Sequence, residues 1–151
     1  MTKVSMLDST VQKTHEWLRD IKQGLGFDND RAAYAALRAA LHGVRDLLST
    51  DQVAQFGAQL PTLLRGIYYE GWNPASTLAP PRQRHDFLET VRHELREHLE
   101  LRDTDRVTRI VFGVVAKHVT PGEIEKIVHS LPREVRALWT QSSPQSLPQS
   151  A

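Results

Sequence analysis

Apolar residues recur every three or four positions along most of the chain, which is the spacing of one face of an α-helix. In the first such segment the inward side is formed by Val11, Thr14, Leu18, Ile21 and Leu25, with Trp17 on the flank. This spacing predicts a helix over about Ser9 to Gln23, ended by Gly24 and Gly26, because glycine readily adopts the left-handed conformation that closes many helices. No segment shows the alternation of a strand over a useful length, so the pattern predicts an all-α fold.

A second helix is predicted over about Asn29 to Leu48, with Asp28 as its N-cap. Alanine is the strongest helix former, and its small side chain allows neighbouring helices to approach closely. The apolar stripe of this segment consists of Ala33, Leu37, Ala40, Leu41, Val44 and Leu48.

A third helix begins at Ser49, which together with Gln52 forms the capping-box pattern. In that pattern each side chain accepts a hydrogen bond from the backbone N–H of the other residue. The helix extends to about Glu70, and Gly71 closes it. Because Pro61 lacks a backbone donor, we expect the helix to kink or restart there.

The second half of the chain repeats this pattern. Residues 49–68 align with residues 120–139 without a gap at an offset of 71, and residues 15–21 match residues 85–91 at an offset of 70. A fixed period indicates one supersecondary unit that is built twice. The pairs that coincide include Leu60 and Leu131, Pro61 and Pro132, and Arg65 and Arg136.

Three further helices follow from this alignment, over about 85–99, 104–119 and 120–139. The middle one is capped by Asp103 or Thr104, and the last begins with a proline at its first position and kinks at Pro132. In the first of the three, the residues predicted to face inward are Phe87, Leu88, Val91, Leu95 and Leu99.

Together these elements predict an all-α helical bundle made of two tandem three-helix repeats in a pseudo-two-fold arrangement. Repeat one covers residues 9–72 and repeat two covers residues 85–139, within a single helical domain over residues 1–139. The proline-containing segment 73–84 is the expected linker. The Ser-, Gln- and Pro-rich tail, residues 140–151, is expected to be disordered.

Composition narrows the possible functions. The chain has 151 residues, a formal net charge of +1 and no cysteine. Without cysteine there are no disulfides, thiolate nucleophiles or cysteine-based metal sites. The balanced charge provides no overall attraction to nucleic acid or to an anionic membrane. Because the N-terminus lacks the apolar run of a secretory signal, and no stretch approaches the length of a spanning helix, we expect a cytoplasmic protein without membrane contact.

The run from Arg31 to Trp72 resembles a bacterial and archaeal family, domain of unknown function 2267. Its most specific phrases are Gly57-Ala58-Gln59-Leu60-Pro61 and Tyr68-Tyr69-Glu70-Gly71-Trp72. The resemblance implies an all-helical soluble protein with two related halves, and it brings no catalytic residue, cofactor or substrate. The second half keeps only Trp139 of the aromatic phrase, so a function carried by that phrase would belong to one site in each chain.

That aromatic phrase places three aromatic residues within five positions, at the predicted end of a helix. Tyrosine, tryptophan and arginine are the residues that most often dominate protein–protein binding. Alternatively, Tyr68 and Trp72 pack in the core, and the alignment of Tyr68 with Trp139 favours burial of Tyr68. The candidate binding surface comprises Arg38, His42, Arg65, Tyr69, Glu70 and Trp72.

A basic ridge is predicted on the second helix, where Arg38, His42 and Arg45 are four and seven positions apart and Arg31 precedes them. We interpret it as a solvated face neutralised by acidic neighbours such as Glu70. The other interpretation is that the ridge binds the phosphate backbone of nucleic acid.

Histidines offer no clear chemistry. His85, Glu89 and His93 share one helical ridge, but the two histidines would be about 12 Å apart along the helix axis, too far to bind one ion. We therefore predict no metal site, no cofactor and no catalytic residue.

The preferred hypothesis is a non-enzymatic protein-interaction or regulatory module whose partner is another protein. The alternative is a nucleic-acid-binding protein that uses the basic ridge, which the near-zero net charge disfavours. The sequence leaves homo-oligomerisation open.

Overall fold

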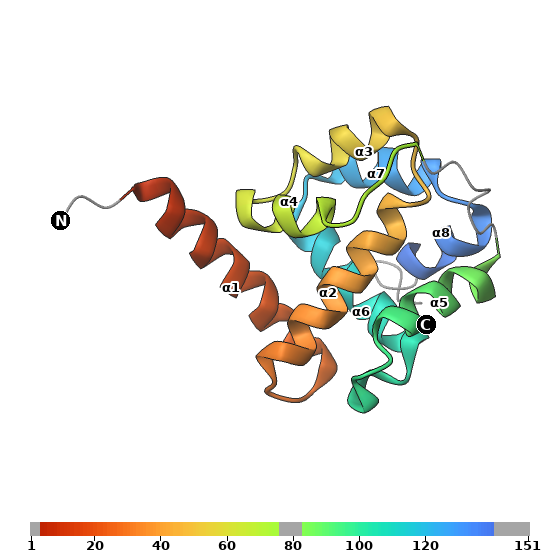
Figure 1. Ribbon diagram of the computed structural model, residues 1–151, viewed down its shortest axis with the longest axis horizontal. Coiled ribbons are helices and arrows are strands. Elements are labelled where there is room, and N and C mark those ends of the chain that lie inside the picture. The colour runs from red at the N-terminus through yellow and green to blue at the C-terminus, as the bar shows by residue number, and fades with distance from the viewer. Residues whose placement is uncertain (1–3, 76–82, 141–151) are drawn as a thin grey trace, which may run out of the picture.

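The structure is a computed structural model that describes residues 4–75 and 83–140. Most of the expected linker and tail lie outside these residues. Within them all regular secondary structure is helical, which confirms the all-α prediction (Figure 1). The elements are α1 (Ser5–Leu25), α2 (Asp30–Arg45), α3 (Thr50–Gly57), α4 (Thr62–Tyr69), α5 (Arg84–Glu94), the short 3₁₀ helix η1 (Leu99–Leu101), α6 (Thr104–His118), α7 (Pro121–Ser130) and α8 (Arg133–Thr140).

Helix α2 lies at the centre, where it packs against α1, α4, α5 and α6 (Figure 1). Its small side chains allow this, because five alanines of the helix are buried. At Gly43 the approach is closest, since a Cβ atom there would lie 2.9 Å from the ring of Phe87 on α5. Helix α2 thus brings residues from both halves of the chain into one core.

The helix contacts of the first half have counterparts in the second. Helix α1 packs on α6, and α5 packs on α2. Helix α4 contacts α1, and α8 contacts α5. Helices α3 and α7 meet directly, where the side chain of Gln52 donates a hydrogen bond of 2.7 Å to the hydroxyl of Ser130.

Local signals placed most helix ends correctly. Ser49 and Gln52 form both bonds of the capping box, and Gly26 closes α1 with a φ of 86°. The predicted cap of α2 is wrong, because Asn29 rather than Asp28 accepts the hydrogen bond from the N–H of Ala32. The carboxylate of Asp28 instead forms an ion pair with a lysine of α1.

The restart predicted at Pro61 is confirmed, because the third segment forms two helices, α3 and α4, and α4 begins directly after Pro61. The guanidinium of Arg65 donates to three backbone carbonyls at this break, those of Gly57, Ala58 and Leu60. Carbonyls at the end of a helix have no intrahelical partner, so these bonds satisfy them. Arg136 makes the matching bonds at the break between α7 and α8, to the carbonyls of Val128, His129 and Leu131.

Two residues predicted to face inward are exposed. Leu99 has 76 % of its surface exposed, because α5 ends at Glu94 and the chain has left the helix before it reaches Leu99. Val11 is 46 % exposed, because the N-terminal turns of α1 project beyond the rest of the molecule (Figure 1).

Candidate binding surface at the end of helix α4

Five of the six predicted surface residues form three groups at the end of α4. Arg38 and Glu70 form an ion pair of 3.2 Å between α2 and the residue after α4. His42 lies beneath them and is 7 % exposed. Tyr69 and Trp72 are half-buried, with ring centroids 5.5 Å apart. Arg65 belongs to none of these groups, because its guanidinium holds the break between α3 and α4.

His42 bridges two elements through its ring. Nε2 lies 2.8 Å from the carbonyl oxygen of Ile67, near the end of α4. Nδ1 lies 2.9 Å from a carboxylate oxygen of Glu94 on α5. Both partners are hydrogen-bond acceptors, so the ring makes both bonds fully when each nitrogen carries a proton.

Arg45 holds the same end of α4 and is only 5 % exposed. One terminal nitrogen of its guanidinium donates to the carbonyls of Tyr68, at 2.8 Å, and Glu70, at 2.7 Å. The Nε–H donates to the carboxylate of Asp46. Arg45 therefore satisfies carbonyls that the last turn of α4 leaves without partners.

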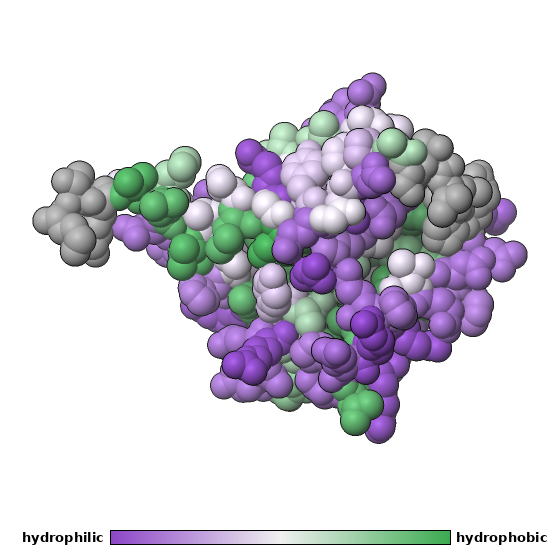
Figure 2. Space-filling model, viewed as in Figure 1, coloured by the Kyte–Doolittle hydropathy of each residue, from purple (hydrophilic) through white to green (hydrophobic). Residues whose placement is uncertain are grey.

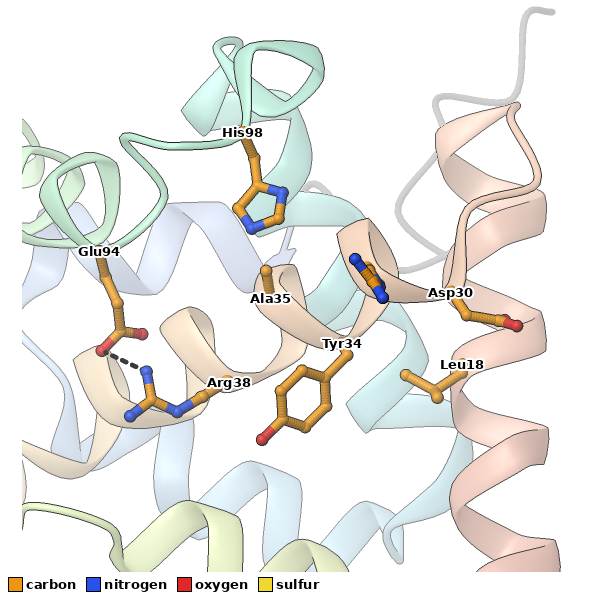
Figure 3. Close-up of a pocket in the computed structure, with 8 residues that line it drawn as sticks. Leu18, Asp30, Tyr34, Ala35, Arg38, Glu94 and His98 are labelled. Atoms are coloured by element: carbon orange, nitrogen blue, oxygen red, sulfur yellow. Dashed lines mark ion pairs between the residues drawn. The ribbon is translucent and has the colours of Figure 1, made fainter.

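The prediction of a solvated basic ridge is wrong for His42 and Arg45, which are buried and bonded to backbone carbonyls. Arg38 is partly exposed, and it faces Glu70 and Glu94. Its ion pair with Glu94 is visible in Figure 3. Of the four predicted ridge residues, only Arg31 falls in the exposed class.

Glu94 is a residue of this site that the sequence did not indicate. Burial of the carboxyl raises its pKa, but the hydrogen bond from His42 and the positive charges of His42, Arg38 and Arg45 outweigh burial, so the pKa lies below its ordinary value of 4.5. Its partner His42 is 52 residues away along the chain, and no local spacing connects them.

Beyond Tyr69 the backbone reverses in what we call the exit turn, residues 69–72. Gly71 adopts a φ of 72°, which favours glycine, and the N–H of Trp72 donates to the carbonyl of Tyr69 at 3.1 Å. Tyr68, just before the turn, is fully buried, and its hydroxyl donates to the carbonyl of Val53. Burial raises the pKa of the Tyr68 hydroxyl. Tyr68 is thus a core residue, whereas Tyr69 and Trp72 reach the surface.

The described residues contain no group of three histidine or acidic side chains placed to bind a metal ion. His85, Glu89 and His93 on α5 are all exposed. None of the helices within residues 4–75 and 83–140 is both long and apolar enough to cross a lipid bilayer.

The chain belongs to the family described as Uncharacterized conserved protein (DUF2267), whose model matches residues 14–138. This match confirms the resemblance noted in the run from Arg31 to Trp72. None of the curated proteins compared with the chain matches it.

Glu94→Gln tests the bridge through His42. The amide oxygen can still accept from His42, but the charge is lost, so we expect the free energy of unfolding at about pH 7 to fall by about 1–2 kcal/mol. The pKa of Glu94 is lower in the folded protein, so the unfolded chain binds more protons between the folded value and 4.5. The stabilisation that this carboxylate provides is therefore fully present above pH 4.5. It is lost as the pH falls through the pKa that Glu94 has in the folded protein.

The measurement is urea unfolding of the wild type and the variant from about pH 7 down to about pH 3. The difference between the two proteins should shrink on acidification. Glu97→Gln, at an exposed position three residues further along the chain, is the control. A difference that stays constant over the whole range would show that the charge of Glu94 does not contribute.

Proposed function

We propose that the protein is a non-enzymatic helical module that binds another protein through the exit turn. One observation carries the proposal: two buried side chains, His42 and Arg45, bond the backbone of α4 and the exit turn from beneath. The partly exposed side chains above these bonds are of the kinds that dominate protein interfaces.

The bonds from α2 fix the shape of the surface. They reach the carbonyls of Ile67, Tyr68 and Glu70, and Gly71 then sets the direction in which Trp72 leaves the helix. A surface that is already ordered loses less conformational entropy on binding than a flexible loop does. We infer that the exit turn is pre-organised for its partner.

The chemistry of the surface indicates what the partner would offer. The rings of Tyr69 and Trp72 favour an apolar side chain between or against them. Beside them, Arg38 and Glu70 present one positive and one negative group, and a polar rim of this kind commonly surrounds an apolar contact. The proposed partner is therefore a folded or extended polypeptide with an apolar anchor flanked by charges.

We also infer that the two halves of the molecule are copies of one three-helix unit in a pseudo-two-fold arrangement. The paired helix contacts support this, as do the matching carbonyl bonds of Arg65 and Arg136. Buried positions at the fixed offsets agree too, since Tyr68 and Trp139 are both in the core. The exit turn itself has no sequence counterpart after Trp139, so the proposal assigns one binding site to each chain.

Trp72→Ala tests the binding proposal. The side chain is half-buried at the surface, so we expect the fold to survive and partner binding to weaken by more than about tenfold. Leu99→Ala is the matched control, because it removes an apolar side chain that is 76 % exposed at a different site. The full-length proteins are used as baits in the cell lysate of origin, after circular dichroism has shown equal helix content.

Proteins retained by the wild type and by Leu99→Ala, but lost with Trp72→Ala, would support the proposed surface. Identical sets of bound proteins for all three baits would contradict it.

The inferred repeat predicts similar roles for Arg65 and Arg136. Lysine cannot reproduce the fork of donors that reaches three carbonyls, so Arg65→Lys and Arg136→Lys should each lower the free energy of unfolding by about 1–2 kcal/mol. Arg92→Lys is the control, because its ion pair with Glu89 is exposed and should matter little. If urea unfolding shows a loss for one of the two arginines only, the two breaks are not equivalent.

A further inference from the structure

Helix α1 carries an apolar seam that continues past the point where the rest of the molecule covers it. Residues at alternating spacings of three and four positions form the seam, which is the heptad spacing of helices that pack side by side. In order along the helix they are Val4, Leu7, Val11, Thr14, Leu18, Ile21 and Leu25. The last four are buried in the core.

The first three are not. Val4, Leu7 and Val11, which we call the open seam, are 56 %, 55 % and 46 % exposed. They lie on the turns of α1 that project from the molecule, and apolar surface follows this helix towards the body (Figures 1 and 2). Contiguous apolar surface of this kind marks interaction sites on many proteins.

Further along α1, about two turns beyond the open seam, α1 and α2 form one side of a groove of about 560 Å³. Leu18 and Ala35 contribute apolar surface to the groove, and the ring of Tyr34, whose residue is 39 % exposed, also lines it (Figure 3). On the far side the groove is bounded by Glu94 and His98. The lining also includes Asp30, Arg31 and Arg38, so the apolar part of the groove lies at Leu18, Tyr34 and Ala35, beside the covered part of the same seam.

We propose that the open seam and this groove join two copies of the chain in an antiparallel α1–α1 contact. With the two-fold axis between residues 11 and 12, residue 4 of one copy lies opposite residue 19 of the other, and residue 7 lies opposite residue 16. Val4 and Leu7 of each copy then lie beside Leu18 of its partner, at the mouth of the groove. The open seam of each copy thus packs against the groove of the other copy. Two-fold symmetry requires a self-complementary contact of this kind.

Complementary polar groups support this register. Asp8 and His15 flank the same edge of the seam, and both are exposed. In an antiparallel pair, residues on the same edge face each other across the axis, so residue 8 of one copy meets residue 15 of the other. A carboxylate then faces an imidazole at two symmetry-related positions.

This contact is separate from the proposed function, because the exit turn contributes no residue to it. Trp72→Ala should leave the association of two copies unchanged, so either proposal can fail without the other.

The first test is the molar mass of the full-length protein, measured by sedimentation equilibrium from about 1 μM to about 1 mM. A mass of twice 17.1 kDa is expected at the upper concentrations. Leu7→Glu should weaken association by more than about 30-fold, since it places a charge in a contact from which water is excluded. Met6→Glu is the matched control, because Met6 is 59 % exposed but lies off the seam. Glutamate favours helix, so neither change should reduce helix content.

The second test fixes the register. The chain has no cysteine, so a single one can be introduced at any position. Val11→Cys lies next to the proposed axis and should give a covalent dimer with a short thiol crosslinker. Val4→Cys should not, because the two copies of residue 4 would be about 22 Å apart along the helices.

A monomer at every concentration would overturn the proposal, and so would a dimer that Leu7→Glu and Met6→Glu weaken equally. Crosslinking through Val4→Cys but not through Val11→Cys would exclude the antiparallel register.

Discussion

Buried donors on α2 hold the end of α4, and the candidate surface depends on this contact. A helix that ends inside a protein leaves carbonyls without partners, and a buried cation is unfavourable unless it is fully hydrogen-bonded. Arg45 and His42 supply partners for these carbonyls, because their donors point at the carbonyls of residues 67, 68 and 70, and the same bonds offset the burial of the Arg45 guanidinium. Without these bonds, the central helix would keep only partly exposed polar contact with the segment that carries Tyr69 and Trp72, such as the ion pair between Arg38 and Glu70.

The same physical solution recurs at two other helix ends. Arg65 donates hydrogen bonds to carbonyls at the end of α3, and Arg136 does so at the end of α7. A positive charge is favourable at these ends because the carbonyl end of a helix is partially negative. Three arginines, Arg45, Arg65 and Arg136, therefore direct their positive charge at backbone carbonyls of the molecule itself. This use explains why the basic residues of α2 do not form an exposed ridge, although their spacing in the sequence is regular. The surfaces that we propose for partners are the exit turn and the open seam of α1.

The sequence predicts well those features that depend on residues close to one another along the chain. The helical state of the predicted segments, the capping box at Ser49 and the closing turn at Gly26 each depend on residues a few positions apart, and these predictions are confirmed, although several helix bounds differ. Polarity and helical spacing alone predict His42 in solvent, whereas its partners Ile67 and Glu94 are 25 and 52 residues away. Helical periodicity predicts Leu99 in the core, because periodicity does not show where a helix stops. The sequence therefore located the aromatic phrase of the candidate site, but not the buried donors that support it.

The measurement that tests the account most directly is amide hydrogen exchange in Arg45→Met, a change that removes the guanidinium but keeps an apolar stem in the core. The amides to follow are those of Glu70 and Trp72, which close the last turn of α4 and the exit turn. Hydrogen bonds from charged donors contribute about 1.5–3 kcal/mol each, so exchange at these two amides should accelerate at least about tenfold, and by more than at Val111 in α6. Unchanged exchange at Glu70 and Trp72 in the folded variant would contradict the claim that Arg45 holds the exit turn in place.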